Sequence, residues 1–378
     1  MKKKIKIILN FFIYLVIIIY SVEILLFTFS SDLQKSLVNI KDKRIELAKK
    51  KNLKYDIREP ETVFFEDNKK IKNLSIPFYY SPLSEELSGF KKAKKNNQII
   101  PFRGPINKKT LSCAEDLNYR IIENDKYGFK NSNSIYDGNI DIILLGGSYA
   151  EGFCYNSDTD IAGNLNDKGM RTLNLGVATT GPLVSLAVLK EFTQKYKTKH
   201  VIYFYYERTS LENLNWEIRE KGLVRYLNRN YKIDYLDKID EINFFLNSVE
   251  KENIKIILDK FLKKKEIKEN KSNFYIESIQ DIIEINILRN KFKNLLTSNA
   301  KTHELDTFYK VLNEIKYETS QLDAKFTFVY IPSWDRFFNK SSSSYSTMKL
   351  RNVIKERLYK DKINVVDLTD FFSESENI

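Results

Sequence analysis

One serine follows an apolar run and two glycines in the stretch Asp141-Ile-Ile-Leu-Leu-Gly-Gly-Ser148. A short apolar strand that runs into a glycine turn and then a hydroxyl is how an α/β protein presents a nucleophile at the carboxyl edge of its sheet. The glycines permit a tight backbone path that a Cβ would block. The chemistry indicated is acyl transfer, in which the Ser148 hydroxyl attacks a carbonyl carbon and fixed donors stabilise the oxyanion.

The base that such a serine needs is not evident. The sequence has two histidines, and none follows His303. His200 begins a predicted strand at the end opposite Ser148, and His303 lies at a predicted helix start, so we expect solvated or capping roles for both. Asp367 and Asp370 follow the last predicted strand. Without a histidine to orient, we assign neither aspartate a triad role.

The elements that must position Ser148 form an α/β pattern from Asp141 onward. Short runs rich in Ile, Val, Leu, Phe and Tyr alternate with helical stretches, which is typical of buried parallel strands with crossover helices. The pattern predicts a flavodoxin-like, doubly wound parallel sheet of five strands with a helical insertion at about 211–320. The predicted strands are 141–145, 172–175, 200–206, 325–331 and 363–366.

The N-terminal region has the features of a membrane anchor. Residues 7–29 are almost wholly apolar behind four lysines, and about 20 apolar residues span a bilayer. The lysines favour a cytoplasmic N-terminus and an exported body. A cleaved secretory signal is the alternative, with a weak cleavage site at Ser30 and Ser31. We therefore expect a transmembrane anchor over 1–30, a stalk and proline-rich wrapping segment over 31–110, and the α/β domain over 111–378.

The net charge of +12 is unevenly distributed. Residues 1–60 and 91–109 each carry +7, which leaves the remainder of the chain at −2. Basic loops and juxtamembrane lysines near anionic headgroups explain this distribution, so no nucleic-acid partner is expected. Two cysteines and two scattered histidines give no zinc-ligand spacing, and we predict neither a metal nor an organic cofactor.

Three further segments approach the predicted sheet edge that carries Ser148, and with it they resemble the SGNH (GDSL-type) hydrolase superfamily. The similarity is strongest to the membrane-anchored SGNH-like proteins of bacterial surface-polysaccharide loci. It runs from about Cys113 to Leu214 and continues more weakly through 329–336 to 365–368. The motifs are Tyr127-Gly-Phe-Lys-Asn131, Gly146-Gly-Ser148, Asn174-Leu-Gly176 with a later Gly181-Pro182, and Tyr205-Tyr-Glu-Arg-Thr-Ser-Leu211.

The resemblance implies that Ser148 is the nucleophile and that the N–H groups of Ser148 and Gly176 are oxyanion donors. Thr209 stands where the family has an asparagine donor, and Gly147 stands where it has an aspartate. The family's histidine motif has no counterpart in this sequence. In other acyl-transfer enzymes, removing one oxyanion donor costs on the order of 100- to 1000-fold in turnover.

Three residues have expected roles at the margin of the site. Cys113 and Cys154 fall where the resembling proteins often have cysteines, so the resemblance implies a disulfide between them, which an exporting compartment would permit. Two unpaired thiols are the alternative. Trp334, after the fourth predicted strand, either lines a carbohydrate pocket or packs in the core.

The resemblance thus implies ester hydrolysis or acyl transfer on acylated, often acetylated, cell-surface carbohydrate. It also implies a single-pass protein of the bacterial inner membrane whose domain faces the periplasm or exterior. A rival interpretation is a catalytically inactive module that binds glycan or a protein partner, favoured by Gly147, Thr209 and the absent histidine. A third is a truncated chain whose longer form carries the histidine.

Overall fold

The structure, a computed structural model, describes most of the chain in two compact units. One unit comprises residues 1–57 and 258–303, and the other comprises 58–257 and 304–378. The described residues are 10, 13–24, 44–58, 60–67, 70–75, 89–112, 118–193, 195–267, 300–333, 335–338 and 343–373.

The predicted membrane anchor falls largely outside the described residues. Of the stretch 1–30, the structure describes residue 10 and the helical residues 13–24. Within the described ranges, no helix combines the length and the apolar character needed to cross a bilayer. The anchor therefore stays a prediction.

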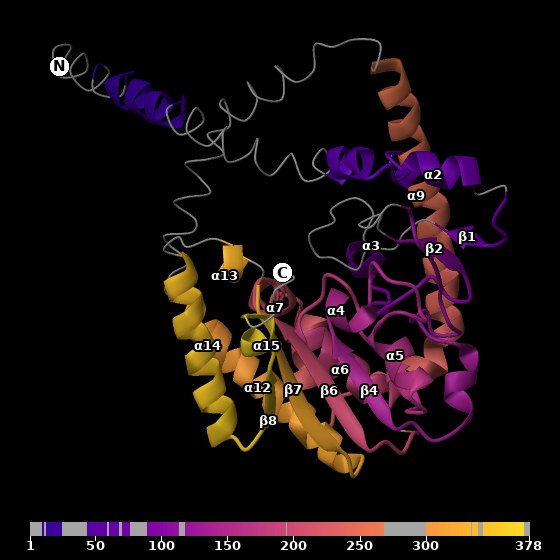
Figure 1. The fold of residues 1–378 in the computed structure, drawn as a ribbon, viewed down its shortest axis with the longest axis vertical. Coiled ribbons are helices and arrows are strands. Elements are labelled where there is room, and N and C mark those ends of the chain that lie inside the picture. The colour runs from indigo at the N-terminus through magenta and orange to yellow at the C-terminus, as the bar shows by residue number, and fades with distance from the viewer. Residues whose placement is uncertain are drawn as a thin grey trace. The chain divides into compact units, whose positions relative to one another are not determined.

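The unit that contains Ser148 is built on a five-stranded parallel sheet with the order β5-β4-β6-β7-β8 (Figure 1). The predicted α/β class is confirmed, and each predicted strand lies within one residue of an observed one. An order in which the first strand lies between the second and third is compatible with a flavodoxin-like fold. The strands are β4 (Ile142–Gly146), β5 (Thr172–Asn174), β6 (His200–Tyr206), β7 (Lys325–Ile331) and β8 (Asn364–Asp367).

Both faces of the central strands are covered, which explains why these strands are mostly apolar. Successive residues of a strand point to opposite faces. In β4, Ile143 and Leu145 enter the larger core with α6 (Pro182–Phe192) and α12 (Ala300–Gln321). Ile142 and Leu144 enter a smaller core with α5 (Ile161–Asp167). This double burial holds the carboxyl end of β4, and therefore Ser148, in a fixed place.

Helices make up the described part of the segment between β6 and β7. They are α7 (Ser210–Glu217), α8 (Lys221–Val224), α9 (Ile239–Ile267) and α12, with short 3-10 turns at Arg225–Leu227 and Tyr235–Lys238. Residues 268–299 of the predicted insertion lie outside the described residues. Downstream, α13 (Asp335–Phe338) and α14 (Ser343–Lys360) lie between β7 and β8, and α15 (Thr369–Ser373) follows β8.

The region before the sheet is more ordered than its prolines predicted. It holds α2 (Pro60–Asp67), α3 (Gly89–Lys95) and a small sheet of β1 (Leu74–Ser75), β2 (Lys109–Leu111) and β3 (Ile121–Glu123). The described parts of the predicted wrapping segment 31–110 thus contain regular helices and strands. Pro60 begins α2, where a missing N–H costs nothing.

Several lysines of the basic stretch 91–109 have acidic partners in the folded chain. Lys92 lies 3.2 Å from Glu252 and Lys94 lies 2.9 Å from Glu220. Lys108 forms an ion pair with Glu250. Part of the positive charge that stands out in the sequence is thus compensated by glutamates more than 100 residues away, which agrees with a structural use of the stretch.

Candidate functional site

Ser148 begins α4 (Ser148–Glu151) directly after the carboxyl end of β4. Gly146 makes this turn possible, because its φ of +136° suits only glycine and a Cβ there would lie 2.7 Å from the Phe204 carbonyl oxygen. Gly147 differs, since its φ is −84° and a Cβ would meet nothing closer than the Thr180 oxygen at 3.5 Å. Among the described residues, no group forms a hydrogen bond with Ser148 Oγ, so the hydroxyl is available to a ligand.

A pocket of about 710 Å³ opens beside Ser148. The rings of Tyr149, Phe153, Tyr155 and Tyr206 line it. The Tyr149 and Tyr206 rings contact each other, with centroids 4.8 Å apart. A concave site with aromatic walls and a few polar groups is typical of a binding site for an organic ligand. The serine that the sequence singled out therefore lies in the wall of a cavity that can hold a substrate.

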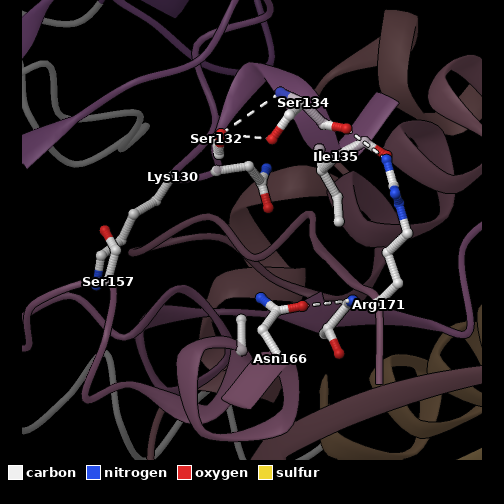
Figure 2. Close-up of a pocket in the computed structure, with 10 residues that line it drawn as sticks. Lys130, Ser132, Ser134, Ile135, Ser157, Asn166 and Arg171 are labelled. Atoms are coloured by element: carbon white, nitrogen blue, oxygen red, sulfur yellow. Dashed lines mark hydrogen bonds between the residues drawn. The ribbon is translucent and has the colours of Figure 1, made fainter. Parts of the chain in front are cut away.

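A second pocket, of about 420 Å³, lies beside the edge strand β5 and is shown in Figure 2. Several of its polar groups already have partners within the protein. The Arg171 guanidinium donates to the carbonyl oxygens of Ser134 and Ile135, and Asn166 Oδ1 accepts from the Thr172 N–H at 2.8 Å. A ligand there would have to displace these bonds, so the aromatic pocket at Ser148 is the better candidate.

The motif residues before β4 hold the site in place. The Asn131 side chain bonds the backbone of Asn174 twice, through Nδ2 to the carbonyl oxygen at 2.9 Å and through Oδ1 from the N–H at 2.8 Å. The Asn174 side chain in turn donates to the Glu151 carbonyl oxygen at 3.3 Å. Asp125 accepts from Asn131 and Tyr136, and burial raises the pKa of its carboxyl against the effect of these bonds. The motif thus positions α4 and supplies no reacting group.

Glu151 connects the nucleophile helix to two other segments. Its side chain is 1% exposed and forms an ion pair with Arg103. Its second oxygen accepts from the Ala178 N–H at 2.5 Å. The helix that carries Ser148 is therefore tied both to the segment before the sheet and to the loop after β5.

The predicted role of Gly176 is corrected by its hydrogen bond. The Gly176 N–H donates to the Asn174 Oδ1 at 2.9 Å, so it does not point into the pocket. Gly176 is required for a different reason: a Cβ there would lie 2.4 Å from the Glu151 nitrogen and 2.6 Å from the Ala150 carbonyl carbon. It is the position where the loop after β5 passes directly against α4.

Thr209 and a residue that the sequence analysis missed lie at the carboxyl end of β6. Thr209 precedes α7 and is half-buried, and its hydroxyl makes no cap bond to that helix. One turn later, Asn213 Nδ2 donates at 2.9 Å to the Thr180 oxygen, which lies 3.5 Å from the place that a Cβ on Gly147 would take. A carboxamide donor is therefore present beside the nucleophile turn, although not at the motif position. Its spacing of four residues from Thr209 on a helix was the available signal.

No described histidine side chain lines the pocket. His200 pairs with Ile142 and Lys325 at the amino end of the sheet, opposite Ser148, as expected. His303 lies in α12, and its side chain is outside the described set. The described part of the chain thus offers Ser148 no imidazole base at the pocket.

The two aspartates after β8 are engaged in ion pairs. Asp367 lies 2.7 Å from Arg351 Nε and 2.8 Å from Lys355 Nζ, and Asp370 lies 3.5 Å from Arg351. Burial of Asp367 opposes its ionisation, but hydrogen bonds from Lys355, Thr369 and Arg351 outweigh it and lower the pKa to about 2. Both carboxylates therefore hold α14 to the end of β8.

Two of the marginal predictions fall on residues that the structure does not describe. Cys154 lines the pocket and is disulfide-bonded. Cys113 and Trp334 lie outside the described residues, so the pairing of the two cysteines and the role of the tryptophan stay predictions.

A buried carboxyl group forms hydrogen bonds with the backbone at the start of α6, next to this site. Glu217 accepts hydrogen bonds from the N–H groups of Gly181 at 2.5 Å and Leu183 at 2.9 Å. Complete burial raises its pKa to about 8, against these bonds, which lower it. As the pH rises, the unfolded state loses the Glu217 proton near its ordinary pKa of 4.5, whereas the folded state keeps this proton up to about pH 8. This contribution to stability is complete below pH 4.5 and is lost as the pH rises through 8.

We expect the Glu217→Gln variant to lose this pH dependence. The wild-type free energy of unfolding should fall by more than about 1 kcal/mol between pH 5 and 8, and that of the variant should stay level over the same window. Urea denaturation at several pH values measures the difference. Glu212→Gln, at an exposed position of the same helix, is the control and should follow the wild type. Parallel curves for wild type and Glu217→Gln would show that Glu217 does not titrate in this range.

Comparison with known proteins gives no relative: no protein-family model matches the chain, and no curated protein matches its sequence.

Proposed function

We propose that this protein is an SGNH-like serine esterase or acyltransferase that acts on acylated, often acetylated, cell-surface carbohydrate. The observation that carries the proposal is the position of Ser148. It follows β4 at the carboxyl edge of a parallel sheet with a flavodoxin-like order, and its hydroxyl opens into an aromatic-lined pocket. Ligands of open α/β sheets bind at this edge.

In the proposed reaction, Ser148 Oγ attacks the acyl carbon and forms an acyl-enzyme as the sugar hydroxyl leaves. The N–H of Ser148 at the start of α4 stabilises the oxyanion. The Gly176 N–H is engaged by Asn174, and one Nδ2 proton of Asn213 is engaged by the Thr180 oxygen, so the remaining Nδ2 proton of Asn213 is the proposed second donor. Water or an acceptor hydroxyl then takes the acyl group. The proton of Ser148 must pass to a base, and its identity decides how fast the chain can turn over.

We propose that an N-terminal anchor holds the protein in the membrane and that its α/β domain faces the periplasm or cell exterior. The disulfide-bonded state of Cys154 supports an oxidising compartment. The lysines before the apolar stretch 7–29 support the same orientation.

A second candidate function is that of a glycan-binding module without catalysis. The observation that favours it is the lack, among the described side chains, of a histidine at the pocket. The aromatic walls of the pocket would serve this function equally well.

Hydrolysis of p-nitrophenyl acetate by the full chain in detergent tests the proposal. Ser148→Ala should lower the rate at least about 100-fold, because the covalent route is lost. Ser157→Ala is the control, since this exposed serine borders the second pocket, and it should retain the wild-type rate. Equal rates for wild type and Ser148→Ala would refute the esterase. If both proteins then bind O-acetylated xylo-oligosaccharide in calorimetry, the binding module is the correct function.

A further inference from the structure

The two charged side chains that line the Ser148 pocket differ in whether the described part of the chain gives them a partner. Asp160 and Lys168 are its two lining residues with a carboxyl or amino group. Asp160 is 1% exposed, and its carboxylate lies 2.8 Å from the buried Lys130 ammonium. Its other oxygen accepts from the Gly163 N–H at 2.7 Å, at the start of α5. The Lys130 ammonium therefore compensates the charge of the Asp160 carboxylate, so this carboxylate presents no net negative charge to a ligand in the pocket.

Lys168 has no such compensation. It is the exposed residue that ends α5, and among the described residues no carboxylate pairs with its ammonium. A cation also interacts favourably with the carbonyl end of a helix, which explains a lysine at this position but not its place in the lining of the pocket. In the described lining, the aromatic rings give the cavity an apolar wall, and the Lys168 ammonium gives it a cationic end.

We infer that the pocket binds a sugar carrying an anionic group, a carboxylate or a phosphate, with the ring against Tyr149 and Tyr206 and the anion at Lys168. The inference rests on the proposed function, because it assigns the substrate class of the same site. An ammonium with three donors forms charge-assisted hydrogen bonds with either anion. A sugar that carries a cationic group, in contrast, would be repelled by Lys168 at this end of the pocket.

Binding to the full-length Ser148→Ala protein tests the inference without interference from ester chemistry. Two matched pairs of ligands differ only in the anion: methyl β-D-glucuronoside against methyl β-D-glucoside, and glucose 6-phosphate against glucose. Calorimetry at low salt should show at least about fivefold tighter binding of one anionic ligand than of its neutral partner. The pair that shows the preference identifies the anion as carboxylate or phosphate. The preference should weaken in high salt.

Substitution then assigns the preference to a residue. Lys168→Gln in the Ser148→Ala background should bring the ratio of affinities to about one while neutral sugars bind as before. Lys195→Gln, at an exposed lysine near the opposite end of the sheet, should leave the ratio unchanged. Equal affinities within both pairs, or a preference that survives Lys168→Gln, would overturn the inference but leave the proposed function standing. Failure of all four sugars to bind would also overturn the inference, while the hydrolysis of p-nitrophenyl acetate by wild type and Ser148→Ala decides the proposed function separately.

Discussion

Replacing Lys130 with methionine is expected to destabilise the protein by about 3–5 kcal/mol. The Lys130 side chain is completely buried, and its ammonium has two hydrogen-bond acceptors and one carboxylate as an ion-pair partner. It donates to the carbonyl oxygens of Gly152 and Tyr155, each at 2.7 Å, and lies 2.8 Å from Asp160. Methionine has a similar volume but leaves the Asp160 carboxylate buried without a counter-charge. Removing one partner in this way destabilises a protein more than replacing both partners with apolar side chains.

The wall of the Ser148 pocket should be lost with the same substitution. Gly152 ends α4, and Tyr155 lines the pocket, so Lys130 fixes both ends of one stretch of that wall. The free energy of unfolding from urea denaturation measures the stability, and ligand binding measures the pocket. Adding Asp160→Asn to Lys130→Met should recover part of the stability, because asparagine removes the charge and still caps α5.

Two controls make this prediction specific. Lys195→Met, at an exposed position, should change stability by no more than about 0.5 kcal/mol. A Lys130→Met protein within about 1 kcal/mol of the wild type would contradict the prediction. So would a double variant no more stable than Lys130→Met alone, because the buried charge would then not be the cause.

The second large effect is expected from the two adjacent glycines before Ser148. Gly146→Ala should destabilise the protein by about 2–4 kcal/mol, because alanine at a φ of +136° is strained and its Cβ would lie 2.7 Å from the Phe204 oxygen. Gly147→Ala should change stability by less than about 1 kcal/mol, since its φ of −84° is ordinary and the nearest atom is 3.5 Å away. Urea denaturation of the two variants, side by side, is the measurement.

The comparison also bears on activity. Gly147→Ala keeps the path of the turn, so it should retain whatever ester hydrolysis the wild type shows. Gly146→Ala should lose it together with stability, because β4 and α4 can no longer meet in the same geometry. Equal destabilisation by the two substitutions would show that the turn does not have the backbone described here.

Much of the fold could be predicted because buried parallel strands have a simple signature. β4, β6 and β7 are largely apolar on both sides, so their sequences are dominated by Ile, Val, Leu, Phe and Tyr. Parallel strands present their carboxyl ends at one edge, which places Ser148 from the sequence alone. The small sheet before β4 was missed because β1, β2 and β3 have two or three residues each, too few to show a period.

The roles of individual polar groups could not be predicted in the same way. The motif suggested that the Gly176 N–H faces a ligand, but the Asn174 side chain takes it, and only the folded loop shows this. Nothing in the sequence distinguishes Lys130 from a surface lysine. Only the folded chain shows that it is buried and lies against Asp160, thirty residues later. The excess of lysines at 91–109 suggested an exposed basic surface until α9 supplied Glu250 and Glu252 as partners.

By itself, then, the sequence determined the α/β class, the five strands of the large sheet and the place of the candidate nucleophile, because burial of a strand or a glycine turn is a local pattern that the chain carries in order. Tertiary structure decided which donors are occupied, which charges are compensated and which rings share a cavity with Ser148. Those properties depend on atoms a few ångströms apart that come from segments distant in sequence. Lys168 is an example: only the folded chain shows that Asp160, the carboxylate in the same pocket lining, pairs with Lys130 and that no described carboxylate pairs with the Lys168 ammonium.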